Sequence, residues 1–127
     1  MRTIRNIAAV TLIISVLLSF AACGKNKKKY TWDNYDFYVT EVYEPYRRYE
    51  NEKTKSVIVS IKMDKEGMPP DVFDANIEEG NILLNGVKPN RMYLYKQDKK
   101  TKRMVSVDLT FFMPKDYALN ENDLVIK

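Results

Sequence analysis

Histidine is absent from this 127-residue chain, and cysteine occurs once, at Cys23. Without histidine the chain lacks the commonest general base, cannot form a Ser-His-Asp triad and has no imidazole ligand for zinc. A single cysteine cannot form a disulfide within the chain. The four glycines form no glycine-rich phosphate loop. We therefore expect a protein that is not an enzyme and has no cofactor and no metal centre.

Acidic residues are missing before Asp33, and the first 22 residues differ from all that follow. Arg2 and Arg5 form a cationic head, and residues 7–20 form an apolar run interrupted only by hydroxyl side chains. A cationic head, an apolar middle and a small-residue end are typical of a secretory signal peptide. The run has 14 residues, whereas a membrane-spanning helix needs about 20. Residues 1–22 are therefore predicted to be a signal peptide in preference to a signal-anchor helix.

The end of this leader, Phe20-Ala21-Ala22-Cys23-Gly24, resembles the bacterial lipobox. In that motif an apolar residue, two small residues and a cysteine are recognised by lipoprotein signal peptidase. The resemblance implies cleavage before Cys23 and lipidation of its sulfur, which would also account for an otherwise unpaired thiol in an exported protein. Because two or three acyl chains anchor a protein far more firmly than one, we expect lipid anchoring at the extracytoplasmic face of the bacterial cell membrane.

A lysine-rich stretch, residues 23–29, follows the leader and has no apolar periodicity. It is predicted to be a flexible tether. Its lysines could attract anionic lipid headgroups, at about 1 kcal/mol each, or could simply form a solvated spacer. Residues 30–127 then remain as one small domain.

The net charge of +4 comes from the leader and the tether. Of the 21 basic residues, two lie in residues 1–22 and four in residues 23–29, which leaves 15 against the 17 acidic residues. A nucleic-acid-binding protein needs a basic face on the domain itself. We therefore expect no nucleic-acid partner.

Apolar and polar residues alternate through most of the domain, which predicts strands. The clearest strands lie in residues 35–40, 56–63 and 105–111, and shorter ones are expected in residues 81–84, 91–96 and 123–126. Asn85-Gly86 predicts a tight turn. The polar residues 97–102 predict a hairpin connection, and residues 70–77 a single short helical turn.

Several short strands with turn signals between them are typical of a β-sandwich. The segments 35–39, 57–61 and 109–114 resemble the immunoglobulin-like domains of unknown function found in small Gram-positive lipoproteins. The resemblance implies an all-β, immunoglobulin-like antiparallel β-sandwich over residues 30–127. It implies an extracytoplasmic location and little about a ligand. We expect this domain to be a monomer.

Candidate recognition residues gather after the first strand, in the stretch from Tyr43 to Tyr49. Tyrosine and arginine supply rigid contact area and directed donors at binding surfaces, and loops often carry function. In the alternative the tyrosines cover the end of the core and the arginines pair with nearby glutamates. Trp32 is expected to pack on the domain, with a sugar-stacking role left open. The candidate ligand-binding residues are Trp32, Tyr43, Tyr46, Arg47, Arg48 and Tyr49.

An acidic stretch, Asp71 to Glu79, contains oxygen ligands of the type that calcium accepts. It lacks the spacing of a calcium loop, so a solvated acidic segment is favoured over a metal site. The adjacent Glu78 and Glu79 are not expected to act as a catalytic acid and base.

Two functions remain open. One is a lipid-anchored binding or protein-interaction module that contacts an envelope protein or a wall polymer through its loops. The other is an accessory or structural lipoprotein subunit that stabilises a membrane complex through a sheet face. In the second case Tyr38, Ile58 and Phe112, at outward positions, would form the contact surface.

Overall fold

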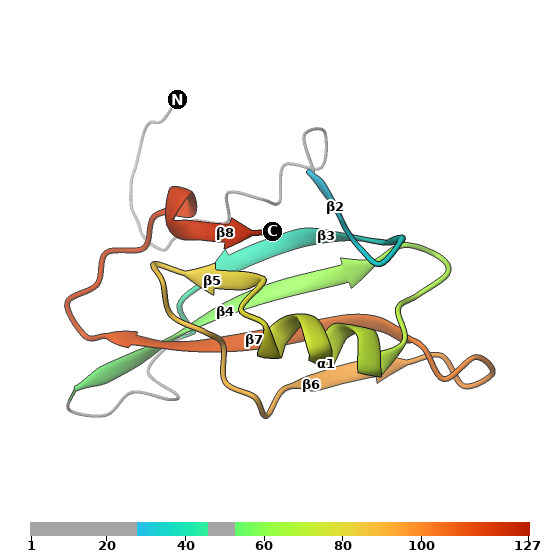
Figure 1. Ribbon diagram of the computed structural model, residues 1–127. Helices are drawn as coiled ribbons and strands as arrows, with labels where there is room; N and C mark the ends of the chain where they lie inside the picture. The colour runs from blue at the N-terminus through green and yellow to red at the C-terminus, as the bar shows by residue number, and fades with distance from the viewer. Residues whose placement is uncertain (1–27, 46–52) are drawn as a thin grey trace, which may run out of the picture.

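A computed structural model describes residues 28–45 and 53–127 of the chain. Within them the chain forms antiparallel sheets with one α-helix, so the all-β prediction is confirmed (Figure 1). The larger sheet has the order β2-β3-β4-β7-β6, formed by β2 (Lys29–Trp32), β3 (Tyr35–Tyr43), β4 (Thr54–Met63), β7 (Met104–Pro114) and β6 (Leu94–Gln97).

A second layer covers one face of this sheet (Figure 1). It contains helix α1 (Pro70–Glu78) and a two-stranded sheet of β5 (Ile82–Leu84) and β8 (Leu124–Ile126). Strand β8 directly follows the short 3-10 helix η2 (Glu121–Asp123). The indole Nε1 of Trp32 donates a hydrogen bond of 2.8 Å to the backbone oxygen of Lys127. This bond joins strand β2 to the end of β8.

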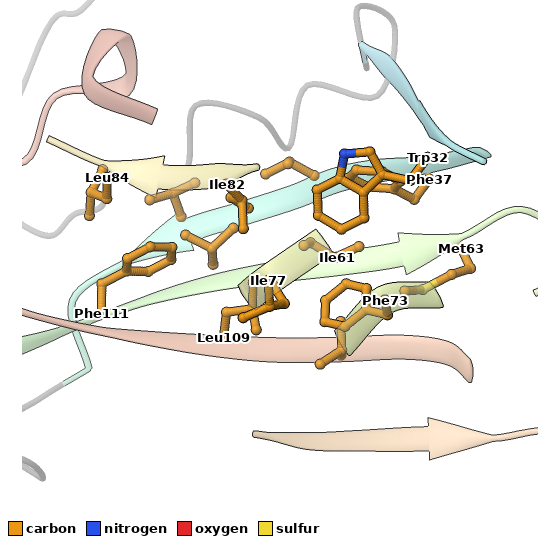
Figure 2. Close-up of a cluster of buried hydrophobic side chains, with 14 of the residues drawn as sticks. Trp32, Phe37, Ile61, Met63, Phe73, Ile77, Ile82, Leu84, Leu109 and Phe111 are labelled. Atoms are coloured by element: carbon orange, nitrogen blue, oxygen red, sulfur yellow. The ribbon is translucent and has the colours of Figure 1, made fainter. Parts of the chain in front are cut away.

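The core lies between the two layers (Figure 2). Strand β4 sends Val57, Val59, Ile61 and Met63 into it, as strict alternation requires. From the other layer come Phe73 and Ile77 of α1, four residues apart and therefore on one helix face. The three long predicted strands are confirmed, and their predicted inward residues pack in or against the core except Val105, where a register shift between β6 and β7 places Met104 in the core.

Helix α1 is longer than the single turn predicted for residues 70–77. Pro70 lies at its start, where a missing backbone N–H removes no helical hydrogen bond. At its end Gly80 has a φ of +76°. Asn81 N donates to Asn76 O at 3.0 Å and Gly80 N to Ile77 O at 3.1 Å, which is the Schellman arrangement. These local signals favour nine residues of helix.

Two other details differ from the sequence-based expectations. Lys29, assigned to the tether, is the first residue of β2. The strand predicted for residues 91–96 begins at Leu94 and includes Gln97. The Asn85-Gly86 turn is confirmed by positive φ angles at both residues; it closes a bridge between Leu84 and Val87, while β5 pairs with β8.

Candidate binding face

The face of the large sheet that points away from α1 carries the outward residues of β3, β4 and β7; we call it the open face. Two register rows define its centre. Tyr43, Ile58 and Thr110 form one row, and Glu41, Ser60 and Asp108 form the next. A bulge in β3 between Val39 and Glu41 shifts the alternation, so that Glu41 and Tyr43 take outward positions there.

A hollow of about 580 Å³ lies on the open face. It extends from the end of β3 across β4 and β7 to the segment that leads into β6. Its lining is mainly apolar and aromatic, and consists of Tyr43, Pro45, Ile58, Asn90, Met92, Tyr93, Leu94, Asp108, Thr110 and Phe112. Its size lies within the range of ligand pockets, about 300–1,000 Å³.

The rim of the hollow exposes large apolar side chains. Met92 is 85% exposed, Leu94 87% and Phe112 44%, whereas Ile58 between them is 7% exposed. Ile58 is therefore the buried floor of the hollow, and the other three side chains stand around it. Because burial of apolar area is favourable, apolar side chains gathered in one place on a surface are typical of a contact site.

The segment before β6 is oriented by Tyr93. Its ring packs edge-on against Phe73, with ring centres 5.3 Å apart, and its hydroxyl donates to Asp74 Oδ1 at 2.9 Å. Burial and this hydrogen bond raise the pKa of Tyr93 above its ordinary value of 10.0. Since successive side chains of an extended segment point to opposite sides, anchoring Tyr93 to α1 leaves Leu94, the register partner of Asp108, on the open side. Met92 and Leu94 lie at the edge of the sheet, where they also border a pocket beside α1.

Two further contacts hold this segment in place. Asn90 N donates to Thr110 O at 2.7 Å, which ties it to β7. Arg91 forms an ion pair with Glu78 of α1. The apolar rim is therefore attached both to the sheet and to the helix.

Asp108 is the charged residue of the hollow. Its Oδ1 accepts a hydrogen bond of 2.8 Å from Ser60 Oγ on the neighbouring strand. Nearby, burial raises the pKa of Tyr43, and the negative charges of Asp108 and Glu41 raise it further. The phenol of Tyr43 is therefore neutral at physiological pH, as an uncharged wall beside Asp108.

The structure gives different outcomes for the candidate residues predicted from the sequence. Tyr43 lines the hollow. Cys23, Tyr46, Arg47, Arg48 and Tyr49 lie outside the described residues.

Trp32 lies in the core with 3% of its surface exposed, so the packing role expected for it is confirmed. Its ring centre is 4.6 Å from that of Phe37 and 5.6 Å from that of Phe73. The ring is thus enclosed by aromatic neighbours, and Trp32 does not contribute to the open face.

Of the three residues considered for a contact through the sheet, the hollow brings together Ile58 and Phe112. Tyr38 lies at another position, beside a second hollow of about 430 Å³ lined with Lys62, Met63, Asp64 and Lys65. Only part of the expected surface is therefore contiguous.

The acidic stretch lies on and after α1, where its side chains serve structural contacts: Asp74 accepts from Tyr93 and Glu78 pairs with Arg91. In residues 28–45 and 53–127, no group of three or more cysteine or carboxylate side chains is placed to hold a metal ion. In the same part of the chain no helix is long and apolar enough to cross a membrane.

Sequence reasoning missed Met92, Leu94 and Asp108 as site residues. Four large side chains in succession, Met92 to Tyr95, were a usable signal, because a half-buried strand would alternate with polar residues. Asp108 was correctly placed on an outward position of its strand, but its neighbours on other strands could not be inferred from that pattern.

Comparison of the chain with protein-family models, with curated proteins and with solved structures finds no match.

Proposed function

We propose that this chain is a bacterial lipoprotein, anchored through Cys23 at the extracytoplasmic face of the cell membrane, and that it binds an envelope protein through the open face. The observation that carries the binding role is the hollow with Met92, Leu94 and Phe112 exposed around the buried Ile58. The leader and the stretch Phe20 to Gly24 support the anchor.

The binding role is tested by comparing two apolar side chains of similar exposure on different layers. Phe112, at the hollow, is 44% exposed, and Val125, on β8, is 48% exposed. A photo-crosslinking amino acid at position 112 of the full-length protein in cells should give a discrete crosslinked product, whereas the same amino acid at position 125 should not. Equal crosslinking at both positions would refute the assignment of the open face.

The anchor is tested by Cys23→Ala with Ser15→Ala as the control. Because the cysteine sulfur carries the diacylglyceryl group, Cys23→Ala should abolish labelling by a fatty-acid probe and block processing, while Ser15→Ala should retain both. A labelled Cys23→Ala protein would remove the lipoprotein assignment.

A second candidate is an accessory subunit that stabilises a membrane complex. The specific observation in its favour is that Ile58 and Phe112, from adjacent strands, contribute to one apolar surface on a sheet face. The two candidates differ in the persistence of the complex. A subunit should co-purify with its partner at constant stoichiometry, whereas an interaction module should dissociate on dilution.

For the fold we propose kinship with the immunoglobulin-like sandwiches of such lipoproteins. Two antiparallel sheets that enclose one core support this. The smaller layer departs from that pattern, since it consists of two short strands and α1.

A further inference from the structure

The hollow combines an apolar lining with one negative charge. Among its lining residues in the described part of the chain, Asp108 is the only charged one. The ion pairs found in the described part of the chain join Lys29 to Asp36, Lys55 to Glu44 and Arg91 to Glu78, and none of them includes Asp108. The Asp108 carboxylate therefore faces the hollow with a hydroxyl as its hydrogen-bond partner and with no paired cation in residues 28–45 and 53–127.

The neighbouring register positions carry charges of both signs, but no cation there contacts Asp108. Glu41 lies across Ser60 from Asp108, and adds a second carboxylate to the same row. Lys62 and Lys96 lie in the next row with Ser106, and neither forms an ion pair with Asp108. Asp108 is itself exposed, so the hollow carries its negative charge on a solvent-accessible wall.

This charge selects among possible occupants. An anionic group would be repelled by Asp108. A purely apolar side chain would remove water from the carboxylate without replacing it, and burying an unpaired charge is costly. A cation at the end of a hydrocarbon stem satisfies both parts of the site, because its charge pairs with Asp108 and its stem packs on apolar side chains.

The aromatic residues fit the same occupant. Tyr43 and Phe112 both line the hollow, and aromatic faces attract ammonium and guanidinium groups. Lysine and arginine side chains carry these groups on stems of several methylenes. Polar atoms beside the acid, such as the hydroxyl of Thr110, can accept a further donor of the incoming group.

We propose that the open face binds a partner-protein segment that presents a lysine or arginine side chain between apolar residues, with Asp108 pairing the cation and Tyr43, Ile58 and Phe112 enclosing its stem. This inference rests on the proposed function, since it specifies what the envelope partner presents. Met92 and Leu94 then contact the apolar neighbours of the basic residue.

The test uses the full-length lipoprotein in cells, with a photo-crosslinking amino acid at position 92. Asp108→Asn keeps the size of the side chain and an oxygen that can accept from Ser60, but removes the charge. Asp33→Asn is the matched control, since Asp33 is an exposed carboxylate in the turn between β2 and β3, at the opposite edge of the sheet, and asparagine also accepts its positive φ. Losing a charged hydrogen-bond partner should lower the crosslinked fraction about tenfold in Asp108→Asn, while Asp33→Asn should match the wild type.

Additional measurements exclude trivial causes. Thermal unfolding of Asp108→Asn should resemble that of the wild type, which separates lost binding from lost folding. Asp108→Glu keeps the charge and should retain more crosslinking than Asp108→Asn. Mass spectrometry of the product should place the crosslink within a few residues of a lysine or arginine of the partner, and replacing that residue by methionine should reproduce the loss.

The outcomes separate the two proposals. Crosslinking at position 92 that persists unchanged in Asp108→Asn overturns the basic-residue inference and leaves the binding face in place. A product formed with lipid, or with a second copy of this chain, overturns the partner named here. No product in the wild type overturns the proposed function, and this inference with it.

Discussion

Replacement of Phe73 by alanine should destabilise the domain far more than the same replacement at Phe112. Phe73 is 0% exposed and its ring lies 5.6 Å from Trp32 and 5.3 Å from Tyr93, so its removal leaves a cavity inside an aromatic cluster. Truncation of a buried phenylalanine costs about 3–5 kcal/mol. A small domain has a total stability of about 5–15 kcal/mol, so this single change removes a large part of it.

Phe112, on β7, provides the comparison, because it is the same residue type with 44% exposure. Its partly buried ring gives up a smaller transfer free energy, about 1–2 kcal/mol, and opens no internal cavity. In urea titrations followed by circular dichroism, Phe73→Ala should lower the midpoint much more than Phe112→Ala, with similar m values. A cost for Phe73→Ala equal to or below that of Phe112→Ala would refute the packing role assigned to α1.

Three further outcomes are expected. Gly67→Ala should destabilise the domain more than Gly86→Ala in thermal unfolding. Both glycines have positive φ, which costs about 1 kcal/mol for alanine. A Cβ on Gly67 would also lie 2.9 Å from Arg103 Cβ and from the backbone oxygen of Met104, whereas a Cβ on Gly86 would meet nothing within 4 Å. Equal losses would contradict the close approach at Gly67. The free energy of unfolding should fall as pH rises above 10.0, because burial and a hydrogen bond to Asp123 raise the pKa of Tyr117 to about 12, and the unfolded chain therefore releases this proton first. Thermal unfolding midpoints measured between pH 9 and 12 should decline less in Tyr117→Phe than in the wild type. An identical decline in both proteins would contradict the role of Tyr117. Trp32→Phe should lower the free energy of unfolding by about 1–2 kcal/mol, because it removes the hydrogen bond to Lys127 and has a smaller ring. Hydrogen exchange should show weaker protection of the β5–β8 pair. Unchanged protection of β8 would contradict the link between Trp32 and β8.

The long strands could be predicted from sequence because alternation is a local pattern. Val57, Val59 and Ile61 face the core as expected, and each position is determined by the pleat of its own strand. The pairing of Ile82–Leu84 with Leu124–Ile126 could not be predicted in this way. It joins segments about 40 residues apart, and neither short strand specifies its partner.

The candidate site was predictable only in part. Tyr43 was named for its place in a tyrosine- and arginine-rich stretch, and it does line the hollow. Ile58 was assigned to the outward side correctly, but its 7% exposure depends on neighbours from β3, β7 and the segment before β6. Exposure of Met92 and Leu94 depends on the anchoring of Tyr93 by Phe73 and Asp74, contacts between distant parts of the chain.

The position of β2 bears on how an anchored protein would present the hollow. Lys29, where the described chain enters the sheet, is in register with Tyr38 and through it with Lys62 and Ser106. The hollow centres on the row of Ile58, which lies four residues before Lys62 in β4, or about 14 Å away along the strand. It also extends across β7 to the segment before β6, at the opposite edge of the sheet, about 19 Å from β2. A chain tethered through Cys23, as we propose, would therefore be attached near one corner of the open face and contact its partner toward the opposite corner, with the intervening sheet acting as a rigid spacer between lipid and partner.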